Sequence, residues 1–573
     1  MTELLTNNLP LLAGAPNGIK KLRELILELA VRGKLVPQDP NDEPASELLK
    51  RISEEKARLV AEGKIKKRKP LTEIYEEAQR LELPAGWEWS SLAQVSFVNP
   101  RNAAADSLEV SFVPMTFIGT RFDDQHAQEP RLWGEVKQGF THFAEGDIGV
   151  AKITPCFENS KACVFSNLVN GLGAGTTELH IVRPVTGTLD PRYVLAYLKS
   201  PQFLLVGETK MTGTAGQKRL PKDFVEENPF PLPPLAEQHR IVAKVDELMA
   251  LCDRLEAQQA DAENAHAQLV QALLDSLTQA SDATDFAVSW QRLAENFHTL
   301  FTNEFAIDAL KKALLHLAVT GKLVPQDLTE EPASELLKRV EGEKQRLVAE
   351  GVMKKHKPLV EFRTGDIKLE LPTAWKWVPL LDITTGMDSG WSPACLGNSS
   401  PSDDVWGVLK TTAVQVMSYL EHENKELPSH LEPRPEAEAK VGDILFTRAG
   451  PMNRVGISCL VESTRPKLMI SDKIIRFHPV ELGIYGRFIA LCLNAGETAK
   501  YLEQAKSGMA ASQVNISQEK LRMAPIPLAP LLEQHRIVEK VDQLINLCDT
   551  LKQRINVARS KQTELLNAVM AQV

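Results

Sequence analysis

The sequence predicts a multidomain fold of the mixed α+β and α/β classes, internally duplicated with pseudo-two-fold symmetry. Two globular domains are expected, separated by long paired helices that form an antiparallel coiled coil. A helix-forming stretch occurs twice, as PLPPLAEQHRIVAKVDELMALCDRL at Pro231–Leu255 and as PLAPLLEQHRIVEKVDQLINLCDTL at Pro527–Leu551. A second block occurs twice without a gap, at Ile19–Gly63 and Ile307–Gly351. Repeats of this length indicate a duplicated half.

The repeats divide the chain into two matching sets of three segments, each with a helical region, a globular domain and a long helix. Between the repeats, short β-branched runs alternate with Gly, Pro and Asn, which predicts α/β domains. The predicted boundaries are 1–80 for the N-terminal helical region, 81–229 for the first globular domain, 230–280 for the first long helix, 281–369 for the central helical region, 370–525 for the second globular domain and 526–573 for the second long helix.

The repeated long helices share an apolar seam in which steps of four and three residues alternate. In the first copy the seam reads Ile241, Val245, Leu248, Cys252, Leu255, and the second copy repeats it 296 residues further on. This spacing keeps one stripe facing a neighbouring helix, as in a coiled coil. We therefore expect the two helices to pair, with the polar seam residues His266 and Gln562 fixing the register. Packing of each helix on its own domain is the alternative.

The other repeated block predicts a helical hairpin. Apolar residues from Ile19 to Leu29 recur at helical spacing, and Gly33 supplies the residue that ends the helix. A turn leads to a second helix that begins near Pro44. A basic run follows each hairpin: Lys64, Lys66, Lys67, Arg68 and Lys69 in the first half, Lys354, Lys355, His356 and Lys357 in the second. These residues either contact phosphate or cap the helix C-terminus.

Composition limits the classes of protein. A hydrophobic content of 43% in 573 residues is enough for several cores, and the net charge of −9 means that nucleic-acid binding has to be local. The seven cysteines form no CxxC pair, which is typical of reduced thiols in a cytoplasmic protein. The sequence lacks a signal peptide and a long uncharged apolar stretch, so we expect a cytoplasmic protein without a membrane partner.

Motifs of known catalytic sites are missing from the sequence. No Gly-Lys pair is followed by Ser or Thr, as a P-loop requires, and the twelve histidines give no HExxH. Asn99-Pro100-Arg101 is only a fragment of the amino-methyltransferase motif. His239 and His535, within the repeated EQHR, are expected to pack or to cap a helix. We therefore predict no catalytic, cofactor-binding or metal-binding residue in this chain.

Together, three sets of strings resemble one family. They are the duplicated EQHRIV helix starts, the domain openings LPAGWEW and LPTAWKW, and the duplicated block containing LAVRGKLVPQ and LAVTGKLVPQ. The chain resembles the specificity (S) subunit of a type I restriction-modification enzyme over nearly its whole length. Each string alone would be a weak signal, but their arrangement is specific.

The resemblance implies a non-catalytic subunit that recognises double-stranded DNA. Two variable target-recognition domains each read one half of an interrupted sequence. Paired helices hold these domains apart and dock two modification subunits, which carry S-adenosylmethionine and methylate adenine. Restriction subunits that use ATP and Mg perform translocation and cleavage. All of these cofactors are therefore expected on partner subunits.

The residues expected to contact DNA lie in two polar regions of each globular domain. A loop of small and polar residues precedes each PLPP or PLAP string, where close approach to the duplex is possible, and family members commonly bring this loop to DNA. A second region follows each Gly-Asp-Ile string. The candidates are Thr212, Thr214, Gln217, Lys218, Arg219, Lys152 and Thr154 in the first domain, and Ser507, Ser512, Gln513, Asn515, Arg448, Asn453 and Arg454 in the second.

Two alternatives come from other classes. A self-contained methyltransferase or nuclease with two recognition domains would need a cofactor or metal site within Pro84–Pro229 or Pro372–Pro525. A coiled-coil assembly protein would have no role with nucleic acid.

Overall fold

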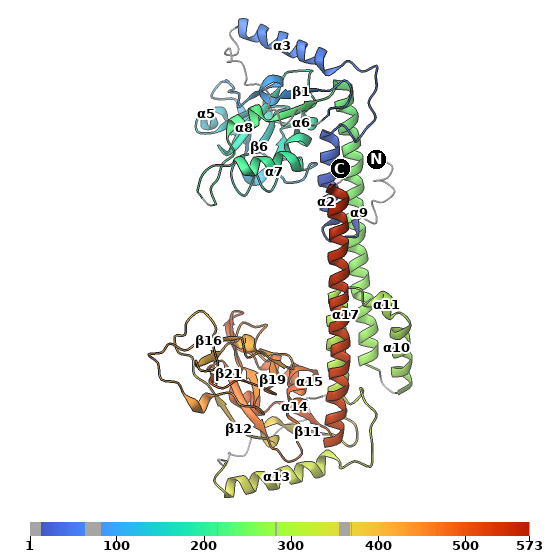
Figure 1. The fold of residues 1–573 in the computed structure, drawn as a ribbon, viewed down its shortest axis with the longest axis vertical. Coiled ribbons are helices and arrows are strands. Elements are labelled where there is room, and N and C mark those ends of the chain that lie inside the picture. Colours follow the sequence, from blue (N-terminus) through green and yellow to red (C-terminus); the bar gives the residue numbers. More distant parts are fainter. Residues whose placement is uncertain are drawn as a thin grey trace. The chain divides into compact units, whose positions relative to one another are not determined.

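The computed structural model describes residues 13–62, 82–214, 216–280, 283–353, 367 and 369–571. Contacts divide the chain into two compact units: the first is Met1–Glu263 with Ala558–Val573, and the second is Asn264–Val557. Each unit contains the two helices of the repeated block, an α/β domain and parts of both long helices (Figure 1). The predicted mixed, internally duplicated fold is therefore confirmed, whereas the six segment boundaries remain predictions.

The repeated block forms two helices joined by a loop in each unit: α2 (Gly18–Val31) and α3 (Ala45–Ala61), and α12 (Glu304–Val319) and α13 (Ala333–Ala349). The predicted hairpin packing is wrong, because α2 and α12 pack on helices of the α/β domains, whereas α3 packs on α4 and α13 on η5 (Figure 1). We call each helix–loop–helix segment the hairpin block, or hairpin for short. The apolar stripe of α2 is buried, and the same positions are buried in α12. Gly33 and Gly321 follow the first helix of each hairpin with φ of +66° and +72°. This left-handed conformation ends the helix and favours glycine.

Each α/β domain is built on a four-stranded antiparallel sheet with the same strand order. The order is β2-β9-β6-β7 in the first unit and β12-β21-β17-β19 in the second. A separate strand pair, β1–β10 or β11–β24, joins the start of each domain to its end. The bounds are β1 (Glu88–Ser91), β2 (Ser96–Val98), β6 (Ile148–Ala151), β7 (Ala162–Val164), β9 (Leu179–Pro184), β10 (Pro229–Leu232), β11 (Lys376–Pro379), β12 (Thr384–Ser389), β17 (Ile444–Thr447), β19 (Ser458–Leu460), β21 (Ile474–Pro479) and β24 (Pro525–Leu528).

A second sheet in each domain differs more between the units. It has the order β4-β3-β8-β5 in the first and β16-β13-β20 in the second, with one parallel pair in each. The strands are β3 (Glu109–Val113), β4 (Glu129–Leu132), β5 (Thr141–Ala144), β8 (Leu172–Gly175), β13 (Gly407–Leu409), β16 (Asn424–Glu426) and β20 (Leu468–Met469). The second domain also has β14 (Val414–Gln415), β15 (Ser418–Tyr419), β18 (Ala449–Gly450), β22 (Ser507–Ala510) and β23 (Gln513–Asn515).

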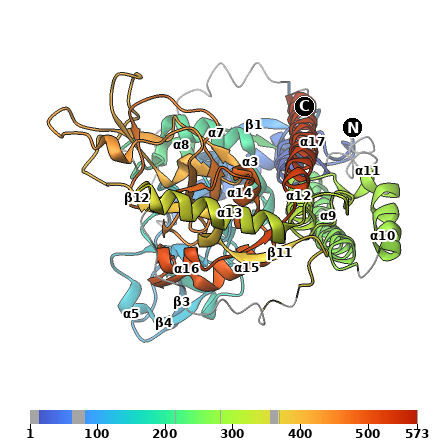
Figure 2. The same cartoon turned by 90° about the horizontal axis from the view of Figure 1, so that it is seen from below.

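Short helices complete the domains, and Figure 2 shows α14, α15 and α16 of the second unit. Their bounds are α4 (Leu92–Val95), α5 (Trp133–Val136), α6 (Pro191–Leu198), α7 (Pro201–Lys210), α8 (Lys222–Glu227), α14 (Gly486–Asn494), α15 (Gly496–Ala505) and α16 (Gln518–Arg522). The 3-10 turns are η2 (Met115–Phe117), η3 (Val169–Gly171), η5 (Leu380–Ile383), η6 (Thr411–Ala413) and η7 (Pro435–Ala437). Helices α10 (Ala283–Glu295) and α11 (Phe297–Leu300) lie between the first long helix and the second hairpin.

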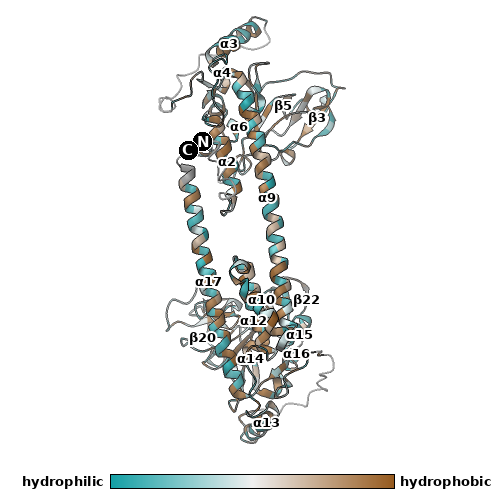
Figure 3. Ribbon diagram, turned by 90° about the vertical axis from the view of Figure 1, so that its right-hand side faces the viewer, coloured by the Kyte–Doolittle hydropathy of each residue, from teal (hydrophilic) through white to brown (hydrophobic). Residues whose placement is uncertain are grey.

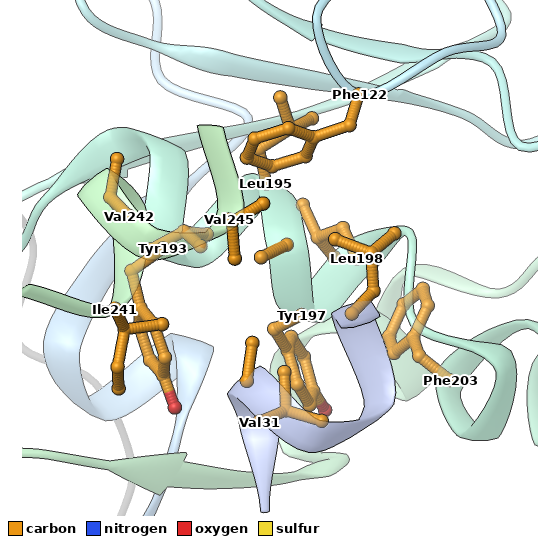
Figure 4. Packing of buried hydrophobic residues seen from close by; sticks show 14 of the residues in the cluster. Val31, Phe122, Tyr193, Leu195, Tyr197, Leu198, Phe203, Ile241, Val242 and Val245 are labelled. Carbon is orange, nitrogen blue, oxygen red and sulfur yellow. The ribbon is translucent and has the colours of Figure 1, made fainter. Parts of the chain in front are cut away.

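One continuous core in the first unit joins the hairpin, the α/β domain and the long helix. Helix α6 lies at its centre, where every residue from Tyr193 to Leu198 is buried. Val31 of α2, Phe203 of α7 and Ile241 of the long helix belong to the same cluster (Figure 4). The Tyr193 hydroxyl donates to the Pro231 carbonyl at 2.8 Å, so its polar atom is paired despite full burial.

The seams of the long helices α9 (Leu235–Thr278) and α17 (Leu531–Ala571) pack against hairpin helices within the units. In the first unit, the seam of α9 from Ile241 to Cys252 shares a core with α2. In the second unit, Leu544 and Cys548 of α17 and the end of α9 share a core with α12. Hydrophilic residues cover much of the rest of α17 (Figure 3). The heptad pattern thus predicts the buried stripe correctly, and hairpin helices are neighbours of that stripe.

The polar seam residues take local roles. The His266 ring donates from Nε2 to the Thr299 carbonyl at 3.1 Å, and the Gln562 side chain is exposed. Neither observation supports a role in fixing register.

The three repeated strings of the sequence meet at one buried carboxylate in each unit. Trp87 of the domain opening donates from Nε1 to Glu237 Oε2 at 2.9 Å, and Gln38 of the hairpin donates to Glu237 Oε1 at 3.1 Å. In the second unit, Glu533 accepts in the same way from Trp375 at 3.0 Å and from Gln326 at 2.7 Å. We call each arrangement the carboxylate joint.

The neighbouring residues of EQHR extend each carboxylate joint. Gln238 accepts from the Asp190 backbone N–H at 2.9 Å, which attaches the N-terminus of α6 to α9. Gln534 accepts from the Tyr485 N–H at 2.9 Å in the second unit. Arg240 pairs with Asp42 of the hairpin at 2.6 Å. Each of these side chains therefore ties the long helix to a different part of its half.

The two histidines of EQHR do not enter the joints. His535 stacks on Tyr485, with ring centroids 4.1 Å apart, and His239 is largely exposed. The predicted packing role therefore holds for His535. His239 Nε2 lies 3.9 Å from the Asp190 carboxylate, beyond hydrogen-bond distance.

Substitution of Gly33 tests how closely the domain opening approaches the hairpin. A Cβ at Gly33 would lie 2.4 Å from Pro84 Cγ and 2.9 Å from Trp87 Cζ2. Gly139 also has a positive φ, +79°, but a Cβ there would meet nothing within 4 Å. We expect Gly33→Ala to lower the free energy of unfolding by about 1–3 kcal/mol more than Gly139→Ala does, because of this clash. Urea unfolding measures both variants, and equal losses would contradict the close contact.

A matched pair of tryptophan variants tests the carboxylate joint of the second unit. Burial raises the pKa of Glu533, while the hydrogen bond from Trp375 opposes that rise by favouring the ionised form. Trp375→Phe removes this bond, so we expect the free energy of unfolding to fall by about 1–3 kcal/mol near pH 8. The loss should shrink as pH falls through the raised folded-state pKa, because the protonated carboxyl depends less on the indole donor.

The control is Trp377→Phe, the same change two residues away. The Trp377 indole nitrogen is buried without a hydrogen-bond partner among the described residues. Its replacement is therefore the same chemical change without the loss of a hydrogen bond. A pH-dependent loss of equal size in both variants would show that the Glu533 contact is not the cause.

Candidate nucleic-acid interface

In the first unit, the two candidate DNA-contacting regions lie side by side. Thr212 and Arg219 exchange backbone hydrogen bonds of 3.0 and 2.8 Å, which closes the polar loop. Arg219 also forms an antiparallel bridge with Ile153 in the region that follows β6. The Thr154 N–H donates to the Lys218 carbonyl at 3.0 Å. Backbone pairing therefore brings together residues that are about sixty positions apart in sequence.

The tip of this loop is a tight turn held by its backbone. The Gln217 N–H donates to the Thr214 carbonyl at 3.0 Å. Gly213 has φ of +132°, and a Cβ there would lie 2.7 Å from the Gln217 carbonyl oxygen, so glycine is required. All the candidates of the loop are exposed, whereas the two that follow β6 are half-buried: Thr212, Thr214, Gln217, Lys218 and Arg219, and Lys152 and Thr154.

One candidate of the first unit is already paired with an acid. Arg219 donates to the Glu178 carboxylate from Nε at 3.0 and 3.2 Å and from Nη2 at 2.8 Å. These hydrogen bonds hold the pKa of Glu178 below its ordinary value. Lys218 has no ion-pair partner among the described residues, so its ammonium is available to a ligand.

The second unit brings its candidate regions together in the same way. Strand β18 after β17 pairs with β23, which in turn pairs with β22, so that Asn515 lies between Ala449 and Ser507. The Ile516 N–H donates to the Arg448 carbonyl at 2.8 Å, as the Leu220 N–H donates to the Lys152 carbonyl at 2.7 Å in the first unit. The exposed candidates here are Ser507, Ser512, Gln513, Asn515 and Asn453, and Arg448 is half-buried.

The side chain of Arg454 is already hydrogen-bonded within the second domain. Its guanidinium donates to the carbonyls of Thr411 and Val414 at 2.8 and 2.7 Å, and to Gln415 Oε1 at 3.2 Å. Both terminal nitrogens thus hold the chain around β14. A contact of Arg454 with DNA remains a prediction, and these bonds would compete with it.

Sequence reasoning missed one basic residue of the second site. The Arg448 N–H donates to the Lys473 carbonyl at 2.8 Å, so Lys473 lies beside the candidates. It occupies the place of Glu178, whose carbonyl accepts from the Lys152 N–H at 3.0 Å. Lys473 is exposed. At this place the second site therefore presents a base where the first site presents an acid.

The basic runs, possible metal sites and possible membrane spans add no further candidate among the described residues. The two basic runs after the hairpins, Lys64–Lys69 and Lys354–Lys357, lie outside the described residues. Within the part of the chain that the structure describes, no group of three or more His, Cys, Asp or Glu residues could hold a metal ion. The helices among these residues include none that is long and apolar enough to cross a bilayer.

Comparisons with known proteins point in one direction. A family model described as the type I restriction modification DNA specificity domain matches residues 435–558. The specificity subunit of the type I restriction enzyme EcoEI from Escherichia coli is 57% identical over 553 residues, which cover 96% of this chain and 93% of the relative. The EcoAI specificity subunit, also from Escherichia coli, is 45% identical over 564 residues, with the same coverage of 96% and 93%.

A solved structure is similar at lower identity. It is the HsdS subunit from Thermoanaerobacter tengcongensis, which is 18% identical with a TM-score of 0.43 and covers 86% of this chain and 97% of its own.

Neutral variants of the second site test its contact with DNA. We expect Arg448→Gln and Lys473→Gln each to weaken binding of DNA by the chain assembled with its expected modification partner. If each residue contacts one phosphate, the slope of log affinity against log salt should become shallower by about 0.9 per variant. Titrations at several salt concentrations measure this slope.

Lys440→Gln is the matched control. Lys440 is exposed and lies before β17, whereas Arg448 follows the other end of that strand. Lys440→Gln changes the net charge by the same amount as either site variant. The slope of log affinity against log salt for this variant should equal that of the unchanged chain. Slopes that stay the same in both site variants would exclude Arg448 and Lys473 as phosphate contacts.

Proposed function

We propose how this chain reads DNA. The premise is that the chain belongs to the family of type I restriction enzyme specificity subunits. It provides the DNA sequence specificity of a type I restriction-modification system. Each α/β domain reads one half of a bipartite, interrupted target through its polar loop and the region beside it. This reading positions the subunits that modify and restrict the DNA.

One observation carries the division into two half-sites: the same backbone arrangement occurs twice with different side chains. The first site places Lys152, Glu178 and Arg219 together, and the second places Arg448, Lys473 and Asn515 in the matching positions. A common scaffold that presents different donors, acceptors and charges suits recognition of two different base sequences.

The finer assignment of partners and cofactors is also a proposal. The chain itself is non-catalytic and acts in the cytoplasm. Two modification subunits dock on its helical parts and bring S-adenosylmethionine to the adenines, and restriction subunits bring ATP and Mg. The family supports this division of labour. The acidic net charge of −9 fits it as well, because partner subunits then supply much of the phosphate contact.

The alternative functions are not favoured. Both Escherichia coli relatives that match nearly the whole chain are specificity subunits, neither a self-contained methyltransferase or nuclease nor an assembly protein.

Sequencing of methylated DNA tests the function directly. We expect cells that express this chain with its modification partner to gain methyladenine in one new motif with two specified parts and an unspecified gap. Cells with the partner alone supply the baseline. No new methylation from a complex shown to be assembled would contradict the proposal.

An exchange of one domain then tests the half-site assignment. Replacing residues 84–229 with the matching segment of a relative should change one half of the motif and leave the other half as it was. The exchanged segment contains β1 and ends at the first residue of β10, so the β1 of the relative has to pair with the β10 of this chain. The relative should therefore be one that keeps the tryptophan at the place of Trp87, which bonds Glu237. A change in both halves, or in neither, would show that the domains do not read the half-sites separately.

A further inference from the structure

The pair between Arg219 and Glu178 leaves a defined set of donors free. An arginine has five N–H groups in a planar fork. The side-on contact with Glu178 uses Nε–H and one N–H of Nη2. Both N–H groups of Nη1 and the second N–H of Nη2 remain, and Nη1 has no hydrogen-bond partner among the described residues. The Arg219 side chain is 47% exposed, so this free edge reaches solvent.

The free edge has the geometry of a base-reading contact. One N–H on Nη1 and one on Nη2 point in parallel at the end of the guanidinium. In the major groove, guanine presents two adjacent acceptors, O6 and N7, which two parallel N–H donors match. Adenine offers one acceptor and one donor at the same places, so the contact discriminates between the two purines.

The backbone around Arg219 fixes where this fork is held. Arg219 is hydrogen-bonded to Thr212 on one side and bridged to Ile153 on the other. The backbone N–H of Lys152 donates to the Glu178 carbonyl, so the acid is attached to the same small ladder. Both members of the pair are therefore positioned before DNA arrives, which lowers the entropy cost of the contact.

The charge of the Arg219–Glu178 pair favours a contact with a base over a contact with a phosphate. The Glu178 carboxylate cancels the charge of Arg219 and would repel a phosphate close to it. A neutral acceptor such as the guanine edge meets no such repulsion. In the second unit the place of Glu178 is taken by Lys473, and Asn515 takes the place of Arg219, so these two matching positions carry neither an arginine nor an acid.

We propose that Arg219 reads one guanine in the half-site of the first α/β domain, and that Glu178 is the positioning residue that aligns its fork. This proposal rests on the proposed function, since it names a base within the same half-site. Glu178 acts through Arg219 and does not itself contact the base.

The test uses the complete complex and duplexes based on the methylated motif. Each G·C pair of the first half-site is replaced in turn by A·T, and in a second series each guanine is replaced by 7-deazaguanine, which lacks the N7 acceptor. The unchanged complex should lose affinity by roughly 5- to 150-fold for A·T at the guanine that Arg219 reads. A smaller loss in the same direction is expected for 7-deazaguanine at that position.

Three variants distinguish a contact with the base from a general loss of folding or affinity. Arg219→Lys keeps the charge but removes the fork, so discrimination at that one guanine should fall at least about 5-fold, with other positions unchanged. Glu178→Gln should lower discrimination at the same position. Lys218→Gln, the neighbouring control, should weaken binding to all duplexes equally. Unchanged discrimination in the second half-site shows that each variant is folded.

Distinct outcomes would overturn the proposal. One is a first half-site that contains no guanine. Another is wild-type discrimination at every guanine in both Arg219→Lys and Glu178→Gln, whether or not overall affinity falls uniformly. A complex that shows no preference for any base of the first half-site would instead contradict the proposed function.

Discussion

The buried carboxylates of Glu237 and Glu533 determine how each α/β domain is attached to its helices. Each accepts a hydrogen bond from the tryptophan that opens the domain and one from the glutamine of the hairpin. An ionised carboxylate is costly to bury unless its oxygens are paired. The hairpin, the domain and the long helix are therefore coupled through one group. This coupling explains why the strings at the joints repeat so closely while the domain interiors differ.

Much of the fold could be predicted because its signals are local. A glycine at the end of a helix or an apolar residue every three or four positions acts through its immediate neighbours, and the four helices of the repeated blocks form where these patterns indicate. The same patterns do not report what each helix packs on, and the predicted hairpin packing was wrong. The neighbours of the long-helix seam could not be derived in the same way. Isoleucine and leucine at Ile241 or Leu544 complement any apolar stripe, so the pattern shows that a stripe is buried without showing which helix covers it.

In the candidate site, too, the sequence indicates which segments are involved but not which residues become neighbours. Polar loops and glycine turns mark the two regions in sequence, and backbone pairing joins them as adjacent surfaces. Lys473 escaped notice because its relation to Arg448 depends on the register between β17 and β21, which no local pattern reports. The direction of a long charged side chain is equally hidden: Arg448 and Arg454 are six residues apart, yet Arg454 turns inward to the carbonyls of Thr411 and Val414.

The first unit is discontinuous in sequence, and this has a consequence for synthesis on the ribosome. It includes the last turns of α17, where Leu566 is buried and Asn567 accepts a hydrogen bond from Lys21 of α2. All of Asn264–Val557 is translated between these two parts, which takes roughly 15–60 s at about 5–20 residues per second. The first α/β domain has its own strands early in translation, but the helical framework beside α2 is completed only when the residues from Ala558 onward emerge.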